Sequence, residues 1–186
     1  MGLSLDNVSI LVVDDNTFMR RIVKSILNIF QCRDVKEAGD GADALKILNS
    51  GFLPDILITN WQMPTVDGIE LARMIRTGSD SQNPYLPIIM ITGHSEHSRI
   101  LEARDVGINE FLVKPISART LYKHISNVIE RPRQFVRSKT YFGPDRRRKR
   151  ANFTYDGPER RQDDPLADGD SGENGESTEK SWSDDG

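Results

Sequence analysis

Five polar residues of this chain each stand where a short apolar run ends. They are Asp14, Asp15, Asn60, Thr92 and Lys114. Adjacent carboxylates repel each other unless a cation offsets their charge, and Mg²⁺ is a hard ion that suits one or two carboxylates plus water. The lysine ammonium and the threonine hydroxyl are suited to holding phosphoryl oxygens. The residue types therefore indicate a site for a divalent cation and a phosphoryl group, provided that the fold brings them together.

The elements between these residues predict a fold that does so. Apolar runs indicate buried strands at 8–13, 34–38, 55–59, 87–92 and 109–113. Helix-period segments alternate with them, and Ser117 is a suitable N-cap for the last helix. Five strand–helix units favour an α/β fold with a doubly wound five-stranded parallel sheet in the order 2-1-3-4-5. Such a flavodoxin-like sheet gathers functional residues at the carboxyl ends of its strands.

Four sequence blocks at these positions resemble one family. They are VVDDN at 12–16, WQMPTVDG at 61–68, IMITG at 89–93 and FLVKP at 111–115. Their order and spacing resemble the response-regulator receiver domain of two-component signalling, over about residues 6–130. The likeness is to the single-domain, chemotaxis-type regulators of bacterial phosphorelays.

The resemblance implies a role for each matching position. Asp14 and Asp15 match the acidic pair that binds Mg²⁺, and Gln62 matches a residue that gives its backbone carbonyl to the metal. Further matches are a phosphoryl-sensing hydroxyl, an aromatic switch, a phosphoryl-binding lysine and a proline that usually follows a cis bond. These positions hold Thr92, Phe111, Lys114 and Pro115.

Asn60 departs from the family pattern, in which the phosphoacceptor is an aspartate. A neutral carboxamide is a poor nucleophile, so we expect no aspartyl phosphate at this position. One negative charge fewer also predicts weak Mg²⁺ binding. Three interpretations stay open: a natural pseudo-receiver that signals without phosphorylation, a deliberate substitution, or a lineage variant of an ordinary phosphorylatable regulator.

Composition divides the chain into three parts. Only 37% of the residues are hydrophobic, and they gather in residues 1–130, the expected receiver domain. Residues 131–161 hold 11 Lys/Arg against 3 Asp/Glu, and residues 162–186 hold 1 Lys against 9 Asp/Glu. We expect a basic tail followed by an acidic disordered tail. A single cysteine, no long apolar run and no secretion signal favour a cytoplasmic protein without membrane attachment.

The basic tail contains a repeat. Tyr-Phe-Gly-Pro-Asp-Arg-Arg at 141–147 is echoed by Tyr-Asp-Gly-Pro-Glu-Arg-Arg at 155–161. Gly-Pro favours a turn that projects the arginine pairs, which are Arg146, Arg147, Arg160 and Arg161. A solvated tail, a docking element for a partner protein, and a site for nucleic acid or a cyclic dinucleotide such as cyclic di-GMP are alternative interpretations.

The resemblance implies a signalling module rather than an enzyme. Its expected partners are a sensor histidine kinase or phosphotransfer protein, and a downstream protein bound by the face of helix 4, strand 5 and helix 5. The alternatives are an ordinary phosphorylatable regulator carrying an Asp-to-Asn change, and a ligand or nucleic-acid binder that acts through the arginine-rich tail.

Overall fold

A computed structural model describes residues 4–93, 104–138 and 141–145. The chain divides into two units, 1–148 and 149–186, and the second lies outside the described residues. The predictions for the acidic tail and for Arg146, Arg147, Arg160 and Arg161 therefore fall outside the described part of the chain.

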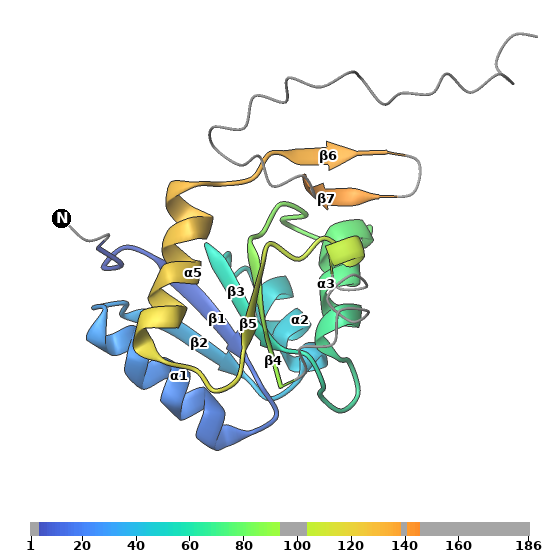
Figure 1. Cartoon of the computed structure of the whole chain (residues 1–186). Helices are drawn as coiled ribbons and strands as arrows, with labels where there is room; N and C mark the ends of the chain where they lie inside the picture. The colour runs from blue at the N-terminus through green and yellow to red at the C-terminus, as the bar shows by residue number, and fades with distance from the viewer. Residues whose placement is uncertain (1–3, 94–103, 139–140, 146–186) are drawn as a thin grey trace, which may run out of the picture. The chain divides into compact units, whose positions relative to one another are not determined.

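Five parallel strands form the central sheet in the order β2-β1-β3-β4-β5, which confirms the predicted topology (Figure 1). Each predicted strand is found to within one residue. The strands are β1 (Ser9–Val13), β2 (Asp34–Ala38), β3 (Ile56–Asn60), β4 (Ile88–Thr92) and β5 (Glu110–Val113). β1 and β4 are almost wholly buried, as expected of strands covered on both faces.

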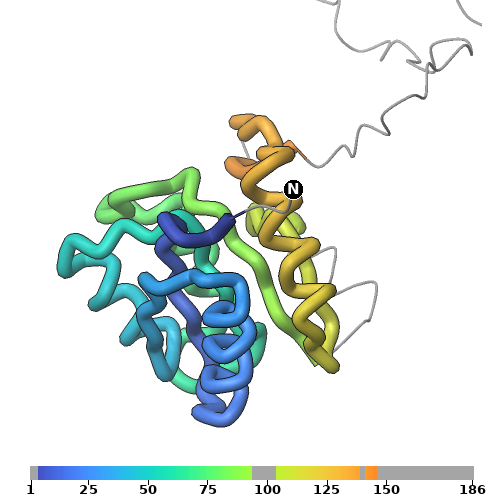
Figure 2. Tube along the Cα trace, turned by 90° about the vertical axis from the view of Figure 1, so that its left-hand side faces the viewer, coloured from blue at the N-terminus to red at the C-terminus, as the bar shows by residue number. Residues whose placement is uncertain are grey.

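Helices cover both faces of the sheet. They are α1 (Thr17–Ile29), α2 (Gly41–Asn49), α3 (Gly68–Thr77) and α5 (Ala118–Glu130). Two core clusters follow from this layering, one beneath α1 and α5 and one beneath α2 and α3. Figure 2, turned by 90° from Figure 1, shows α1 in blue and α5 in yellow to orange. Most of the helix expected before Gly107 lies outside the described residues, although residues 104–106 are helical.

Side chains cap the helices at the places where the sequence breaks the apolar pattern. Asn16 accepts hydrogen bonds from the backbone N–H groups of residues 18 and 19, and Asp67 accepts one from Glu70. Ser117 and Thr120 form a capping box at the start of α5, as predicted for Ser117. No helix in the described part of the chain is both long and apolar enough to cross a membrane.

A short antiparallel hairpin follows α5 and was not predicted. It consists of β6 (Phe135–Arg137) and β7 (Phe142–Pro144). The expectation of a solvated tail from residue 131 is therefore wrong for these residues, because they pack on the preceding α/β domain. The rings of Phe135 and Phe142 lie 5.1 and 5.3 Å from the ring of Tyr85, measured between centroids.

The hairpin lies at the amino ends of β4 and β5. A Cβ atom added to Gly143 would lie 2.8 Å from the Cα atom of Gly107, so the two backbones approach closely through paired glycines. Gly107 itself has a φ of +94°, which glycine adopts without strain. The predicted site residues stand at the carboxyl ends of the strands. The hairpin and the predicted site therefore lie at opposite ends of the strands.

Candidate functional site

The loops after β1, β3 and β5 bring the predicted site residues together. Asp14 follows β1, Asn60 ends β3, and Lys114 follows β5. The Lys114 Nζ atom donates to Asn60 Oδ1 at 3.2 Å and lies 3.7 Å from Asp14 Oδ2. The structure thus brings together three strand ends, as the sheet order predicted. Along the chain, Asn60 is 46 residues from Asp14 and 54 residues from Lys114.

Asn60 also contacts the two remaining predicted metal positions. Its Nδ2 atom donates to the backbone oxygen of Gln62 at 2.7 Å and to Asp15 Oδ1 at 3.2 Å. The side chain of Asn60 is therefore at the centre of the site, between the acidic loop and Lys114.

Asp14 is the buried carboxylate of the site, with only 4% of its surface exposed. Burial raises its pKa above the ordinary value, while the backbone N–H of Asn16 and the ammonium of Lys114 act in the opposite direction. The Asn16 N–H donates to Asp14 Oδ1 at 2.8 Å. The local turn that caps α1 thus also holds this carboxylate in place.

Thr92, Phe111 and Pro115 complete the predicted set. Thr92 ends β4 and is buried, and its backbone oxygen accepts from the Lys114 N–H at 2.8 Å. Phe111 is half-buried on β5 and packs against the core cluster beneath α2 and α3. The Lys114–Pro115 peptide bond is cis, as the resemblance implied.

Two residues near the site were missed by the sequence analysis. Arg20 donates from Nη1 to the backbone oxygen of Asp14 at 2.6 Å and pairs with Glu37 at 3.5 Å. It lies one helical turn beyond the cap residue Asn16, and this spacing could have predicted that Arg20 lies near the site. Gly68 was given no role beyond its place in the block at 61–68, but its backbone lies directly against the carbonyl of Asn60.

Gly68→Ala should destabilise the protein by about 1–3 kcal/mol, because the new Cβ atom would overlap the Asn60 carbonyl oxygen. The strain would also move the backbone that carries the Asn60 side chain. Urea unfolding measures the first effect. Gly93→Ala is the matched control, since no atom of the described residues lies within 4 Å of a Cβ atom at Gly93. Equal stability of both variants would contradict the close approach.

The oxygen atoms of the site can be compared with the ligands that a Mg²⁺ ion, which the resemblance implies, would need. The Asp15 and Gln62 oxygens that would face a cation already accept from the Asn60 amide. No group of three His, Cys, Asp or Glu residues suited to a metal occurs among the described residues. With Asn60 in this arrangement, the residues present fit a Mg²⁺ ion poorly, because the ion would have to displace the Asn60 amide from both oxygens.

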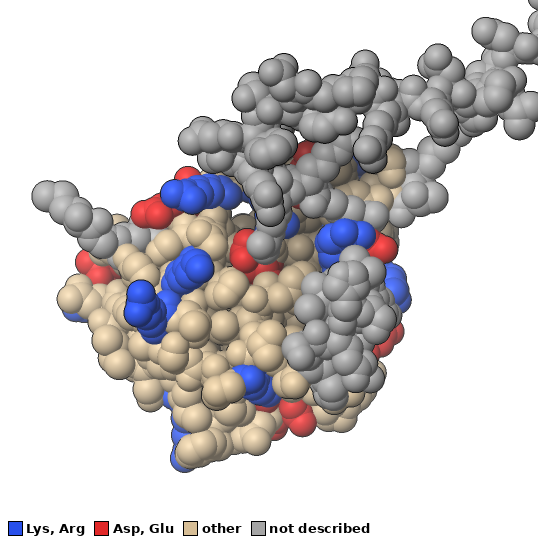
Figure 3. Space-filling model, viewed as in Figure 1, with Lys and Arg blue, Asp and Glu red and all other residues tan. Residues whose placement is uncertain are grey.

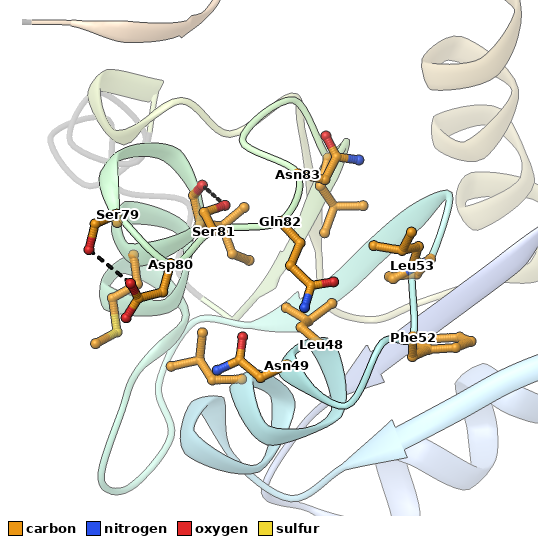
Figure 4. A pocket seen from close by; sticks show the side chains of 15 residues that line it. Leu48, Asn49, Phe52, Leu53, Ser79, Asp80, Ser81, Gln82 and Asn83 are labelled. Carbon is orange, nitrogen blue, oxygen red and sulfur yellow. Dashed lines mark hydrogen bonds between the residues drawn. The ribbon is translucent and has the colours of Figure 1, made fainter.

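An apolar cavity of about 240 Å³ lies elsewhere, between the carboxyl-terminal ends of α2 and α3 (Figure 4). Leu48, Leu53 and Met74 line it, and Asp80 is the one charged side chain among its lining residues in the described part of the chain. None of the predicted site residues borders this cavity. The candidate site is therefore the cluster around Asn60.

The fold and this cluster define a receiver domain, and comparison with known proteins agrees. Residues 10–126 match the response regulator receiver domain family, so the chain belongs to that family. It is 40% identical to the chemotaxis protein CheY-3 of Vibrio cholerae over 125 residues, which cover 67% of this chain and 94% of the relative. It is also 40% identical to the chemotaxis protein CheY of Pseudomonas aeruginosa over 124 residues, 67% of this chain and 98% of the relative.

Solved structures show the same fold. The chemotaxis protein CheY4 of Vibrio cholerae aligns with a TM-score of 0.58 at 30% identity, over 65% of this chain and 98% of that chain. The receiver domain of the sensor histidine kinase PA1611 from Pseudomonas aeruginosa aligns with a TM-score of 0.58 at 24% identity, over 66% of this chain and 98% of that chain. That receiver was solved with a magnesium ion coordinated in its active site cleft. The β6–β7 hairpin lies beyond the residues that match the family.

Proposed function

We propose that this chain is a two-component response regulator that acts by protein–protein contact and is not phosphorylated at Asn60. The observation that carries the proposal is the place of Asn60 at the end of β3, where its carboxamide is hydrogen-bonded on both sides. A carboxylate at this position would attack phosphorus. The amide oxygen is neutral and already accepts from Lys114, so it is a poor nucleophile.

The rest of the pocket keeps the residue types of a phosphoryl switch. We assign Asp14, Asp15 and the Gln62 carbonyl to metal binding, and Thr92, Phe111, Lys114 and Pro115 to phosphoryl binding and switching. Mg²⁺ should bind weakly, because it must displace the Asn60 N–H groups from Asp15 and Gln62. This combination supports a pseudo-receiver better than a pocket that has lost its function altogether.

The proposed partners follow from the family and from the exposed surface. A sensor histidine kinase or phosphotransfer protein is the upstream partner, and a downstream protein binds the face formed by β5, α5 and the helix expected before Gly107, most of which lies outside the described residues. On this side of the molecule Lys and Arg side chains are spread over a largely uncharged surface (Figure 3). Arg119 and Lys123 are exposed on α5, and Val113 on β5 is 40% exposed. A mixed basic and apolar face of this kind suits a protein partner.

The decisive experiment compares this chain with its Asn60→Asp variant. Both are incubated with a small-molecule phosphodonor and Mg²⁺, and their intact masses are measured. The chain with Asn60 should keep its mass, and Asn60→Asp should gain one phosphoryl group, because the variant restores the carboxylate nucleophile.

Two outcomes would overturn parts of the proposal. An acid-stable, base-labile phosphate on the chain with Asn60 would contradict signalling without phosphorylation. An Asn60→Asp variant that stays unmodified would show that the pocket has lost phosphotransfer chemistry beyond this residue. Modification of Asn60→Asp alone, together with a change in partner binding on phosphorylation, would favour the alternative of an ordinary regulator that carries an Asp-to-Asn change.

A further inference from the structure

The nitrogen of the Asn60 side-chain amide faces hydrogen-bond acceptors, and its oxygen faces a hydrogen-bond donor. Nδ2 donates to the Gln62 carbonyl at 2.7 Å and to Asp15 Oδ1 at 3.2 Å, while Oδ1 accepts from the Lys114 ammonium at 3.2 Å. Rotating the amide by half a turn would place oxygen against two acceptors and the NH₂ group against an ammonium. The observed orientation is therefore the one that satisfies all three neighbours.

The two oxygens that Asn60 binds are of the types that coordinate Mg²⁺, a carboxylate and a backbone carbonyl. Two N–H groups of one amide draw them together at the end of β3. Asp14, the other carboxylate of the site, is also engaged, because Asn16 N–H donates to its Oδ1 and Lys114 lies near its Oδ2. Donors of the protein itself thus reach all three proposed metal-binding residues.

We propose that the Asn60 amide is a built-in substitute for the divalent cation, so that the pocket keeps one arrangement whether or not Mg²⁺ is present. The inference rests on the proposed function in one respect, namely that the pocket is that of a receiver without an acceptor carboxylate. Its consequence is regulatory: the interaction face stays in a state that is independent of Mg²⁺.

An aspartate at this position would behave in the opposite way. One of its oxygens would take the place of Nδ2, close to the Gln62 carbonyl oxygen and to Asp15 Oδ1. Oxygen would then face oxygen, and a third carboxylate would join Asp14 and Asp15. Lys114 offsets part of this charge, but only a cation between the oxygens would replace the two lost hydrogen bonds.

The test measures urea unfolding of the full chain and of Asn60→Asp, each in EDTA and in MgCl₂ at equal ionic strength. Mg²⁺ should leave the unfolding midpoint of the chain with Asn60 unchanged. Asn60→Asp should be less stable than this chain in EDTA and should recover in MgCl₂. At Mg²⁺ concentrations about 100 times its dissociation constant, the unfolding equilibrium constant of Asn60→Asp should fall about 100-fold.

Asn83→Asp is the matched control, because it makes the same charge change at an exposed loop position and keeps the oxygen that accepts from the Tyr85 N–H. Its stability should not respond to Mg²⁺. Calorimetric titration should show that the chain with Asn60 binds Mg²⁺ far more weakly than Asn60→Asp does.

The inference is overturned if Mg²⁺ stabilises the chain with Asn60 as much as Asn60→Asp. It is also overturned if Asn60→Asp in EDTA is as stable as the chain with Asn60. Failure of this inference would appear in the Mg²⁺ dependence of stability. Failure of the proposed function would appear as added phosphoryl mass on the chain with Asn60, so the two failures can be distinguished.

Discussion

Arg76→Ala should lower the free energy of unfolding by about 3–5 kcal/mol, because it removes three buried hydrogen bonds from a charged donor, each worth about 1.5–3 kcal/mol before the cost of burying the guanidinium is deducted. Arg76 is 3% exposed, and its guanidinium donates to the backbone oxygens of Gly107 at 3.0 Å and Pro84 at 2.9 Å, and to Asn109 Oδ1 at 3.1 Å. Alanine would leave these buried acceptors without their charged donor. Burial lowers the pKa of Arg76 to about 10, so the group is still charged at neutral pH.

Urea unfolding of Arg76→Ala, Arg76→Lys and Arg73→Ala tests this prediction. Lysine keeps the charge but not the planar fork of donors, so Arg76→Lys should lie between the native chain and Arg76→Ala. Arg73 lies exposed on the same helix, and its replacement should change stability by about 0.5 kcal/mol or less. A loss for Arg76→Ala no larger than that for Arg73→Ala would show that the buried network contributes little.

The network around Arg76 joins elements that the sequence analysis treated separately. Asn109 Oδ1 accepts from both Arg76 and the backbone N–H of Ile88, which links α3 to the starts of β4 and β5. The ring of Phe135 lies 5.1 Å from the guanidinium, at cation–π distance. The hairpin therefore covers a buried cation, and its removal would expose that cation to water.

Strands, sheet order and the residues at the strand ends could all be predicted, because each depends on a local signal. Fully buried parallel strands produce apolar runs, and right-handed crossovers leave few possible topologies. Once the order was set, Asp14, Asn60 and Lys114 had to meet at one edge. The bonds within the site could not be predicted, because the orientation of the Asn60 amide depends on three neighbours from different loops.

The hairpin gave no comparable signal. Its strands have three residues each, too short for a period to be recognised, and β7 consists of Phe-Gly-Pro, which favours a turn in isolation. Its stabilising partners, Tyr85 and Gly107, stand far away in the sequence. The sequence analysis assigned a role to the arginines of the repeat at 141–147, whereas in the structure its aromatic and glycine residues make the packing contacts. The Tyr141 hydroxyl donates to the Pro144 carbonyl at 2.6 Å, so the element also stabilises its own turn.

A chain that ends at Glu130 should be less stable than one that ends at Arg148, by about 2–4 kcal/mol. Three aromatic ring pairs would be lost, each worth about 0.5–1.5 kcal/mol beyond the area it buries. They join Tyr85, Phe135 and Phe142 at centroid distances of 5.1, 5.3 and 5.7 Å. The pair between Arg133 and Glu110, at 3.1 Å, would be lost as well.

Urea unfolding of the two truncated chains and of the full chain separates the hairpin from the residues after it. The chain that ends at Arg148 keeps β6 and β7, so its unfolding free energy should match that of the full chain. Phe142→Ala should reproduce part of the loss, and Val136→Ala is its control because Val136 is 40% exposed. If the chain ending at Glu130 unfolded at the same urea concentration as the others, the hairpin would contribute nothing to the fold. The predicted loss would instead mean that this receiver is completed by residues beyond the family match, and that binding assays on a chain cut at Glu130 would measure a protein with Arg76 uncovered.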